Sequence, residues 1–284
     1  MESNMLAKRK IDYYPTAFIG LVFLSDLAVL FFSDSLWVTI LWSLALLNVK
    51  GWICAWNHHH QHCKFFNYSW ANRSLELIMG LQTGVVGECW VLHHTLGHHR
   101  NYLDQTKDES AWKADNGRTM GPLEYTLKVS ILAYPKAIQV GKKHPRLLKK
   151  LIENIGLTAV VLGIMFWINW VGTLILFAGP MVFLEVMTVY VTYDHHAGLD
   201  EQDPYLATYN ITDRWYNLVS CNLGYHTAHH LRCGKHWSEL PQFHEEIKHK
   251  IPPHLYREPA KPFLLMGKLE RLFTRYFLTP VEEG

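Results

Sequence analysis

Four long apolar runs, separated by polar stretches, dominate the pattern of the chain. Each run is about as long as a helix that crosses the roughly 30 Å hydrocarbon core of a bilayer. Lysine and arginine are absent from residues 11–49 and 151–213 and crowd the remaining segments, as in membrane proteins. We therefore predict an all-α integral membrane helical bundle of two transmembrane hairpins, with spans at 17–32, 36–56, 155–170 and 171–193.

Turn residues and charges indicate how the two hairpins are arranged. Ser33-Asp34-Ser35 is typical of a turn that also caps the following helix, and residues 169–172 should form the second tight turn. Gly179-Pro180 should kink the last span. Because the basic residues 8–10 should stay in the cytoplasm, we expect both termini on the cytoplasmic side and no cleaved signal peptide.

The segment 75–92 is apolar overall but carries Glu76, Gln82 and Glu88. If it crossed the bilayer, the histidines before and after it would lie on opposite sides of the membrane. We therefore expect a buried or interfacial helix that does not cross. Residues 100–150 are polar and basic and should form a cytosolic lobe of short helices. The whole chain, 1–284, is then a single membrane-embedded domain with a cytosolic helical cap.

Histidines gather at the predicted cytosolic ends of the spans. Thirteen of the 18 histidines occur in four clusters, which is unusual for scattered structural residues. On a helix, spacings of three and four residues place side chains on one face, so the imidazoles of the last cluster should reach one metal centre. The pattern predicts metal binding. The clusters cover residues 58–62, 93–99, 195–196 and 226–230.

Nine imidazoles are the candidate ligands, and this number indicates two metal ions. One ion offers at most about six positions, and fewer if a substrate must also bind. A closed zinc site would use four ligands and usually some cysteine, so an almost all-histidine site favours iron or another redox metal. The candidates are His58, His62, His94, His98, His99, His196, His226, His229 and His230.

Other residues in and near the clusters are expected to pack around the ligands or to hold them. The cluster members expected to pack or hydrogen-bond are His59, His60, His93 and His195. A metal-bound histidine usually donates its second ring nitrogen to a polar neighbour. The candidates for this role are Asp104, Asp108, Asp194 and Asn222, with Glu185 inside the last span. The remaining histidines, expected at the surface, are His144, His236, His244, His249 and His254.

In order and spacing, the three larger clusters resemble the histidine boxes of the membrane fatty acid desaturase and hydroxylase superfamily. That pattern is HxxxH, then Hxx(x)HH, then HxxHH, with a further histidine late in the last span, here His196. The resemblance runs from about Trp56 to Pro241, and residues 224–241 are most similar to bacterial acyl-lipid or free-acid desaturases. Two departures bear on the reaction rather than on the metal site. Three residues separate His94 from His98, and Thr192 stands where relatives often carry asparagine.

The resemblance implies an O2-dependent oxidoreductase with two iron ions that introduces a double bond into the alkyl chain of a fatty acid or fatty acyl lipid. A fatty acid decarboxylase that forms terminal alkenes, or an alkyl hydroxylase, would use the same site. The His-Pro-Gly-Gly signature of cytochrome b5 does not occur in the sequence. Electrons should therefore come from a separate ferredoxin or cytochrome b5-type protein with its reductase.

A membrane metal transporter without enzymatic activity is the alternative from a different class. A transporter should hold its ligands near the bilayer midplane, whereas these clusters lie at or beyond the ends of the spans. A zinc hydrolase would need fewer ligands and a recognisable glutamate base. The formal charge of +2 gives no indication of a nucleic-acid partner, and five cysteines without a CxxC spacing do not predict a disulfide framework.

Overall fold

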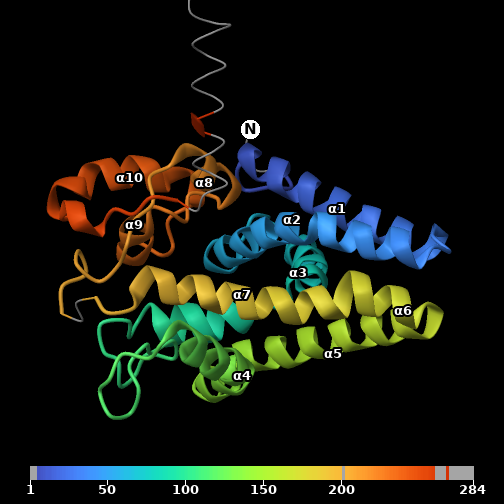
Figure 1. The fold of residues 1–284 in the computed structure, drawn as a ribbon, viewed down its shortest axis with the longest axis horizontal. Helices are drawn as coiled ribbons and strands as arrows, with labels where there is room; N and C mark the ends of the chain where they lie inside the picture. The colour runs from blue at the N-terminus through green and yellow to red at the C-terminus, as the bar shows by residue number, and fades with distance from the viewer. Residues whose placement is uncertain (1–4, 200–201, 260–266, 269–284) are drawn as a thin grey trace, which may run out of the picture.

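The structure, a computed structural model, describes residues 5–199, 202–259 and 267–268. These residues form helices and three isolated β-bridges but no strand, which confirms the predicted all-α class. Four long helices lie side by side and give the protein its elongated shape (Figure 1). They are α1 (Tyr13–Phe32), α2 (Leu36–His62), α5 (Pro145–Ile168) and α7 (Gly179–His196).

Four helical segments are long and apolar enough to cross a membrane, in agreement with the predicted spans. Only 22% to 28% of the most apolar window of each segment is buried inside the protein. Large side chains such as Leu24, Val160 and Val182 are exposed on the outer faces of the helices. An apolar surface of this extent is typical of a face that contacts lipid. The segments are Lys10–Phe32, Leu36–His62, Pro145–Ile168 and Trp170–His196.

The predicted turn at 33–35 is present, whereas the turn predicted over 169–172 is confined to Asn169, because residues 170–173 are helical; the two turns are joined to each other. The hydroxyl of Ser35 caps α2 by accepting a hydrogen bond from the N–H of Val38 at 3.4 Å. Asn169 separates α5 from the short helix α6 (Trp170–Thr173), and its side-chain oxygen accepts from the N–H of Gly172 at 2.9 Å. Its amide nitrogen also donates to the carbonyl of Leu30 at 3.1 Å, so the two outer turns are held together.

The prediction of one helix over 75–92 is wrong, although the expectation that this segment is buried is confirmed. Helix α3 (Ser69–Thr83) ends at Gly84, and a turn separates it from the π-helix η2 (Val91–His98). Gly84 has φ 78°, and a Cβ added there would lie 2.2 Å from the carbonyl oxygen of Met181. Glycine therefore allows α3 to end against α7. In Figure 1, α3 appears nearly end-on between α2 and α7, and it is not one of the four segments able to cross.

The prediction of only short helices in residues 100–150 is also wrong. Helix α4 (Pro122–Gly141) contains 20 residues and packs against α7. Leu123, Leu127 and Ile131, four residues apart, form an exposed apolar stripe along it. Such a stripe on a helix beside membrane spans is typical of an interfacial helix. Polar residues occupy other positions of this helix, so the average polarity of the segment does not reveal the apolar stripe.

The Gly179-Pro180 pair directly follows a π-helical segment, η3 (Leu174–Ala178). Pro180 has no N–H to donate to the carbonyl of Leu176, four residues earlier. The ammonium of Lys50 on α2 donates to this carbonyl at 2.6 Å instead. Lys50 also lies 2.8 Å from a carboxylate oxygen of Asp26 on α1, and both side chains are fully buried. One polar contact thus joins α1, α2 and η3 inside the bundle.

The C-terminal part of the described chain covers one end of the long helices (Figure 1). It contains α8 (Arg214–Val219), α9 (His226–Leu231) and α10 (Leu240–Ile247), with short 3-10 turns between and after them. Helices α9 and α10 pack through a small apolar core that includes Ala228, Leu240 and Phe243. This end of the bundle is the end where α2 and α7 finish in histidines. The cytoplasmic placement predicted for the two chain ends falls on residues 1–4 and 269–284, which lie outside the described residues.

Candidate metal centre

Four elements bring the nine predicted ligands together. Helix α2 contributes His58 and His62 from its C-terminal end, and α7 contributes His196 as its last residue. The π-helix η2 and the residue after it contribute the second cluster, and α9 contributes the third. Eight of the nine side chains are buried, and His62 is partly exposed.

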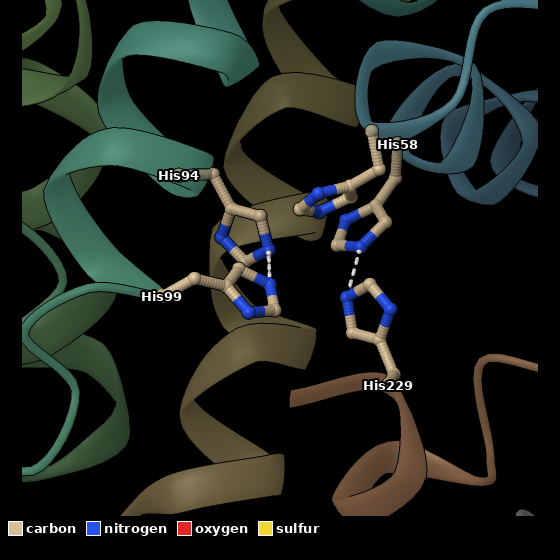
Figure 2. A group of neighbouring side chains, drawn as sticks. His58, His94, His99 and His229 are labelled. Carbon is tan, nitrogen blue, oxygen red and sulfur yellow. Dashed lines mark hydrogen bonds between the residues drawn. The ribbon is translucent and has the colours of Figure 1, made fainter. Parts of the chain in front are cut away.

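Five of these histidines form the first group. Each offers a ring nitrogen, and these nitrogens all lie within 4.8 Å of one another. The Nε2 atoms of His58 and His229 are 2.9 Å apart, and those of His94 and His99 are 3.0 Å apart (Figure 2). Two nitrogens bound about 2.1 Å from one ion at a right angle would lie roughly 3 Å apart. The group therefore fits one metal ion. Its members are His58, His62, His94, His99 and His229.

His98, His196 and His230 form a second group, whose ring nitrogens also lie within 4.8 Å of one another. His226 joins this group at its edge, because its Nε2 atom lies 3.0 Å from the Nε2 atom of His196. The two groups adjoin: the ring of His230 stacks on that of His99 with 4.0 Å between centroids. The arrangement fits two neighbouring ions.

Two of the clusters are divided between the groups, contrary to the expectation that the imidazoles of the last cluster reach one metal centre. Because η2 is a π-helix, the N–H of His99 bonds the carbonyl of His94, five residues earlier, at 2.8 Å. His94 and His99 therefore share the first group, and His98 points to the second. The last cluster is divided too, since His229 belongs to the first group and His230 to the second.

The second ring nitrogens of three histidines face hydrogen-bond acceptors. Nδ1 of His98 donates to the carboxylate of Asp108 at 2.8 Å, and both side chains are buried. Nδ1 of His196 lies 3.2 Å from the carbonyl oxygen of Ala207, and Nδ1 of His62 lies 3.2 Å from the hydroxyl of Thr95. Donation from Nδ1 leaves the Nε2 lone pair free for a metal.

Burial favours the neutral form of four of these imidazoles. Desolvation, and then the neighbouring imidazoles, hold the pKa of His94, His99, His229 and His230 well below its usual value. A neutral ring is the form that binds a metal. Several buried ring nitrogens have no hydrogen-bond partner among the described residues. They include both ring nitrogens of His230 and the Nε2 atom of His62. Buried nitrogens without partners in a ring of converging donors fit a bound cation.

The comparison with known families agrees with this geometry. A model of the family described as fatty acid desaturase matches residues 35–260, which contain every histidine of both groups. The chain belongs to the fatty acid desaturase family. This result confirms the resemblance that the histidine boxes predict.

Curated relatives of this desaturase-family chain come from plants. It is 25% identical over 278 residues to an sn-2 acyl-lipid omega-3 desaturase (ferredoxin), chloroplastic, of Helianthus annuus, covering 82% of this chain and 59% of the relative. It is 25% identical over 282 residues to a chloroplastic omega-3 fatty acid desaturase of Sesamum indicum, covering 84% and 60%. The chain thus spans about three fifths of the length of these relatives. The likeness to bacterial members stays a prediction.

Four predicted supporting residues of the desaturase-family site do not contact its imidazoles. Asp104 is partly exposed and binds Thr106 and Lys107. Asp194 accepts from Arg257 at 2.8 Å, and Asn222 donates to the carbonyl of Trp237 at 3.1 Å. Glu185 is half-buried on α7 beside Gly84. The side chains of Asp104, Asp194 and Asn222 thus have other partners. The Oε1 atom of Glu185 is buried without a hydrogen-bond partner among the described residues.

Trp90 is a contact of the site that the sequence did not predict. Its indole N–H donates to Nδ1 of His58 at 3.3 Å. Indole can only donate, so a neutral His58 then carries its proton on Nε2, the nitrogen that faces His229. His58 must release this hydrogen bond, or lose the Nε2 proton, to bind a metal through Nε2. Sequence reasoning had no signal for this contact because Trp90 and His58 come from different elements.

The remaining histidines have varied surroundings. His60 hydrogen-bonds with Glu76 at 3.4 Å, and His195 stacks on His226 with 4.1 Å between ring centroids. His59 and His93 are buried and lie outside both groups of converging nitrogens. The prediction that His236 and His244 are surface residues is wrong, since both are buried. His236 binds the carboxylate of Asp12 at 2.9 Å, and His244 binds the hydroxyl of Tyr256 at 3.2 Å.

Proposed function

We propose that the protein is an O2-dependent desaturase that introduces a double bond into the acyl chain of a fatty acyl lipid. One observation carries the proposal: two adjoining groups of converging imidazoles lie at one end of four helices able to cross a membrane, in a chain of the fatty acid desaturase family. The relative named as an sn-2 acyl-lipid desaturase with ferredoxin supports an acyl-lipid substrate and a separate electron donor.

Two iron ions suit the donor set. The first group would hold one ion, and the second group with His226 would hold the other. Imidazole nitrogen is a good ligand for iron, and the absence of cysteine from both groups disfavours a closed structural zinc site. When bound, the metal pair would supply the activation of O2 and the removal of hydrogen from an unactivated methylene.

The protein's own residues would hold this site rigid and dry. Asp108 and the carbonyl of Ala207 fix the rings of His98 and His196 through their Nδ1 atoms. The ring of Tyr102 covers His230, with 4.5 Å between centroids. Burial of eight of the nine imidazoles excludes water from the ligands. A dry, rigid site protects a strong oxidant from side reactions and orients one C–H bond of the acyl chain toward it.

The position of the histidines supports an enzyme over a metal transporter. His62 ends α2 and His196 ends α7, so both lie at the ends of membrane-spanning segments rather than near their middle. A transporter should bind its cargo near the bilayer midplane. We also infer that the histidine end of the bundle faces the cytoplasm, where a soluble electron donor can reach it.

Product analysis tests the proposal. The iron-loaded protein would be expressed in cells fed defined fatty acids, and the lipid-derived methyl esters analysed by gas chromatography with mass spectrometry. We expect a fatty acid that has lost two hydrogens and gained one double bond, and no such product from cells that carry a His94→Ala variant. A hydroxylated acid, or a terminal alkene one carbon shorter than the precursor, would instead establish a hydroxylase or a decarboxylase.

A further inference from the structure

A groove of about 620 Å³ opens beside the metal centre. One wall is the end of η2 with the residues that follow it, including Gly97 and Arg100. The opposite wall is the end of α4 and the turn after it, including Lys136 and Lys143. Asp108 lies in the lining as well. The groove therefore extends from the exposed surface to a residue that holds a predicted metal ligand.

The lining of this groove carries a net positive charge. Four cations, Arg100, Lys107, Lys136 and Lys143, stand against the two carboxylates Asp108 and Glu109. Lys136 pairs with Glu109 at 3.3 Å, and Lys107 pairs with Asp104 outside the lining. Within the part of the chain that the structure describes, no ion pair is formed by Arg100 or Lys143, and both side chains are exposed. We call these two residues the cationic rim.

The groove is closely connected to both histidine groups. Arg100 directly follows His99, a member of the first group. Asp108 accepts a hydrogen bond from Nδ1 of His98, a member of the second group, at 2.8 Å. A carrier seated in the groove would thus be one hydrogen-bonded carboxylate away from a ligand.

The surroundings favour a protein over a membrane as the occupant. No large apolar side chain of the described residues between 71 and 122 is exposed. The wall of the groove that contains η2 and Asp108 therefore has no apolar surface that could insert into lipid. The exposed apolar residues of the neighbouring α4 begin at Leu123. A cationic surface without apolar anchors attracts an acidic soluble partner by long-range electrostatics.

We propose that the cationic rim docks an acidic one-electron carrier protein, whose electrons enter the metal centre beside Asp108 and His98. The inference rests on the proposed function, because desaturation requires a supply of two electrons for each double bond. One O2, two hydrogens from the acyl chain, two electrons and two protons give one double bond and two molecules of water. Two successive encounters with a one-electron carrier deliver the electrons.

Charge reversal at the rim tests the proposal. The probe is an acidic plant-type ferredoxin with its reductase and NADPH, added to the iron-loaded full chain in lipid nanodiscs. We expect Arg100→Glu with Lys143→Glu to lower kcat/KM for ferredoxin by about tenfold or more at 25 mM NaCl. The deficit should shrink to about threefold or less at 300 mM NaCl, because salt screens charges at the surface. The matched control, Lys128→Glu with Lys248→Glu, should stay within about twofold of the unsubstituted protein.

Two further measurements separate the possible failures. Dithionite with a small mediator should support equal rates in all three proteins, and their iron contents should be equal. Equal ferredoxin kinetics in the rim variant and the unsubstituted protein at low salt, or a rim variant that is equally slow with dithionite, would overturn the docking proposal. So would a rim variant that loses only its preference for nanodiscs rich in phosphatidylglycerol. Ferredoxin binding measured without substrate tests the docking even if no double bond is formed, an outcome that would count against the proposed function alone.

Discussion

At the scale of single residues, the metal centre depends on how each imidazole is held. His98 is the best-supported ligand, because a buried carboxylate accepts from its Nδ1 and fixes the ring. His196 is fixed in the same way by a backbone carbonyl, which no side-chain substitution removes. His230 has no hydrogen bond at either nitrogen among the described residues. Its ring stacks on His99 and contacts the tilted ring of Tyr102. We therefore expect the ligands to differ in sensitivity to substitution.

Removal of one ring from either group should release metal. We expect His94→Ala, His229→Ala and His230→Ala to abolish desaturation and to lower bound iron, measured by plasma emission spectroscopy on purified protein. His249→Ala is the control, since His249 is exposed and lies outside both groups, and it should change neither quantity. Unchanged iron content in the first three variants would argue against the assignment of ligands.

Asp108 and Asp104 provide a matched pair of substitutions. Asp108→Asn replaces the acceptor of the His98 N–H by an amide and should reduce iron affinity or activity by about 10- to 100-fold, as loss of such a partner usually does. Asp104→Asn alters only the contacts with Thr106 and Lys107 and should have little effect. The measurement is iron retention during titration with a chelator. Equal retention in both variants would show that the contact of Asp108 with His98 does not support the metal.

The nine candidate ligands could be read from the sequence. Of the residues that hydrogen-bond to their second ring nitrogens, only Asp108 was among the candidates. Local spacing reveals which imidazoles gather, because the pattern lies within a few consecutive residues. The partners of the second ring nitrogens depend on contacts between elements, so Ala207 and Trp90 could not be predicted. Asp108 was a candidate, but so were Asp104 and Asp194, and sequence alone gave no reason to prefer one of them.

At the scale of elements, the buried contact of Lys50 with Asp26 and the carbonyl of Leu176 joins α1, α2 and η3. We expect Lys50→Met to destabilise the protein by about 3–5 kcal/mol, because it leaves a buried carboxylate without its cation. The midpoint of thermal unfolding in detergent, followed by tryptophan fluorescence, measures the change. Arg73→Met is the control: Arg73 pairs with Glu153 at 3.1 Å, but both side chains are about half exposed, so the cost should stay below about 1 kcal/mol.

A double variant separates the charge pair from the packing around it. Asp26→Leu combined with Lys50→Met replaces the pair by apolar side chains of similar length, and replacement of a buried pair is often neutral. We expect it to recover most of the stability that Lys50→Met loses, apart from the hydrogen bond to Leu176. If the double variant is as unstable as Lys50→Met, the cation matters through that carbonyl rather than through Asp26.

Element lengths were predictable where one physical demand dominates. A bilayer requires a continuous apolar helix, so the four spans could be found by length and charge alone. The lengths of helices α3 and α4 are not set by the thickness of a bilayer. Each helix buries one face, and its end is determined by contacts with neighbouring elements. The end of α3 depends on the approach of Gly84 to Met181, a contact across about a hundred residues of sequence. The π-helical form of η2 has no periodic signal in eight residues, although it decides that His94 shares a group with His99.

At the scale of the whole molecule, the site exists only if α2, η2, α7 and α9 present their histidines on the same side of the membrane. Two hairpins satisfy this condition, since each pair of spans returns the chain to its starting side. Helix α3 is not among the four segments long and apolar enough to cross, so we expect it to stay on one side and keep the clusters before and after it together. The turns at 33–35 and at Asn169 must then lie on the opposite side, where Asn169 joins them through the carbonyl of Leu30.

Accessibility of introduced cysteines tests this arrangement. We expect Asp34→Cys, at the exposed first outer turn, to react with a membrane-impermeant maleimide in spheroplasts of expressing bacteria. Asn116→Cys and His249→Cys, exposed on the histidine side, should react only after the membrane is opened. The unsubstituted protein reports the background from its five native cysteines, which are buried or partly buried. Labelling of positions 34 and 116 from the same side would mean either that α2 does not cross or that the segment 75–92 crosses as well. Either result would contradict the two-hairpin arrangement, because the histidine clusters could not then all lie on the side opposite to the outer turns.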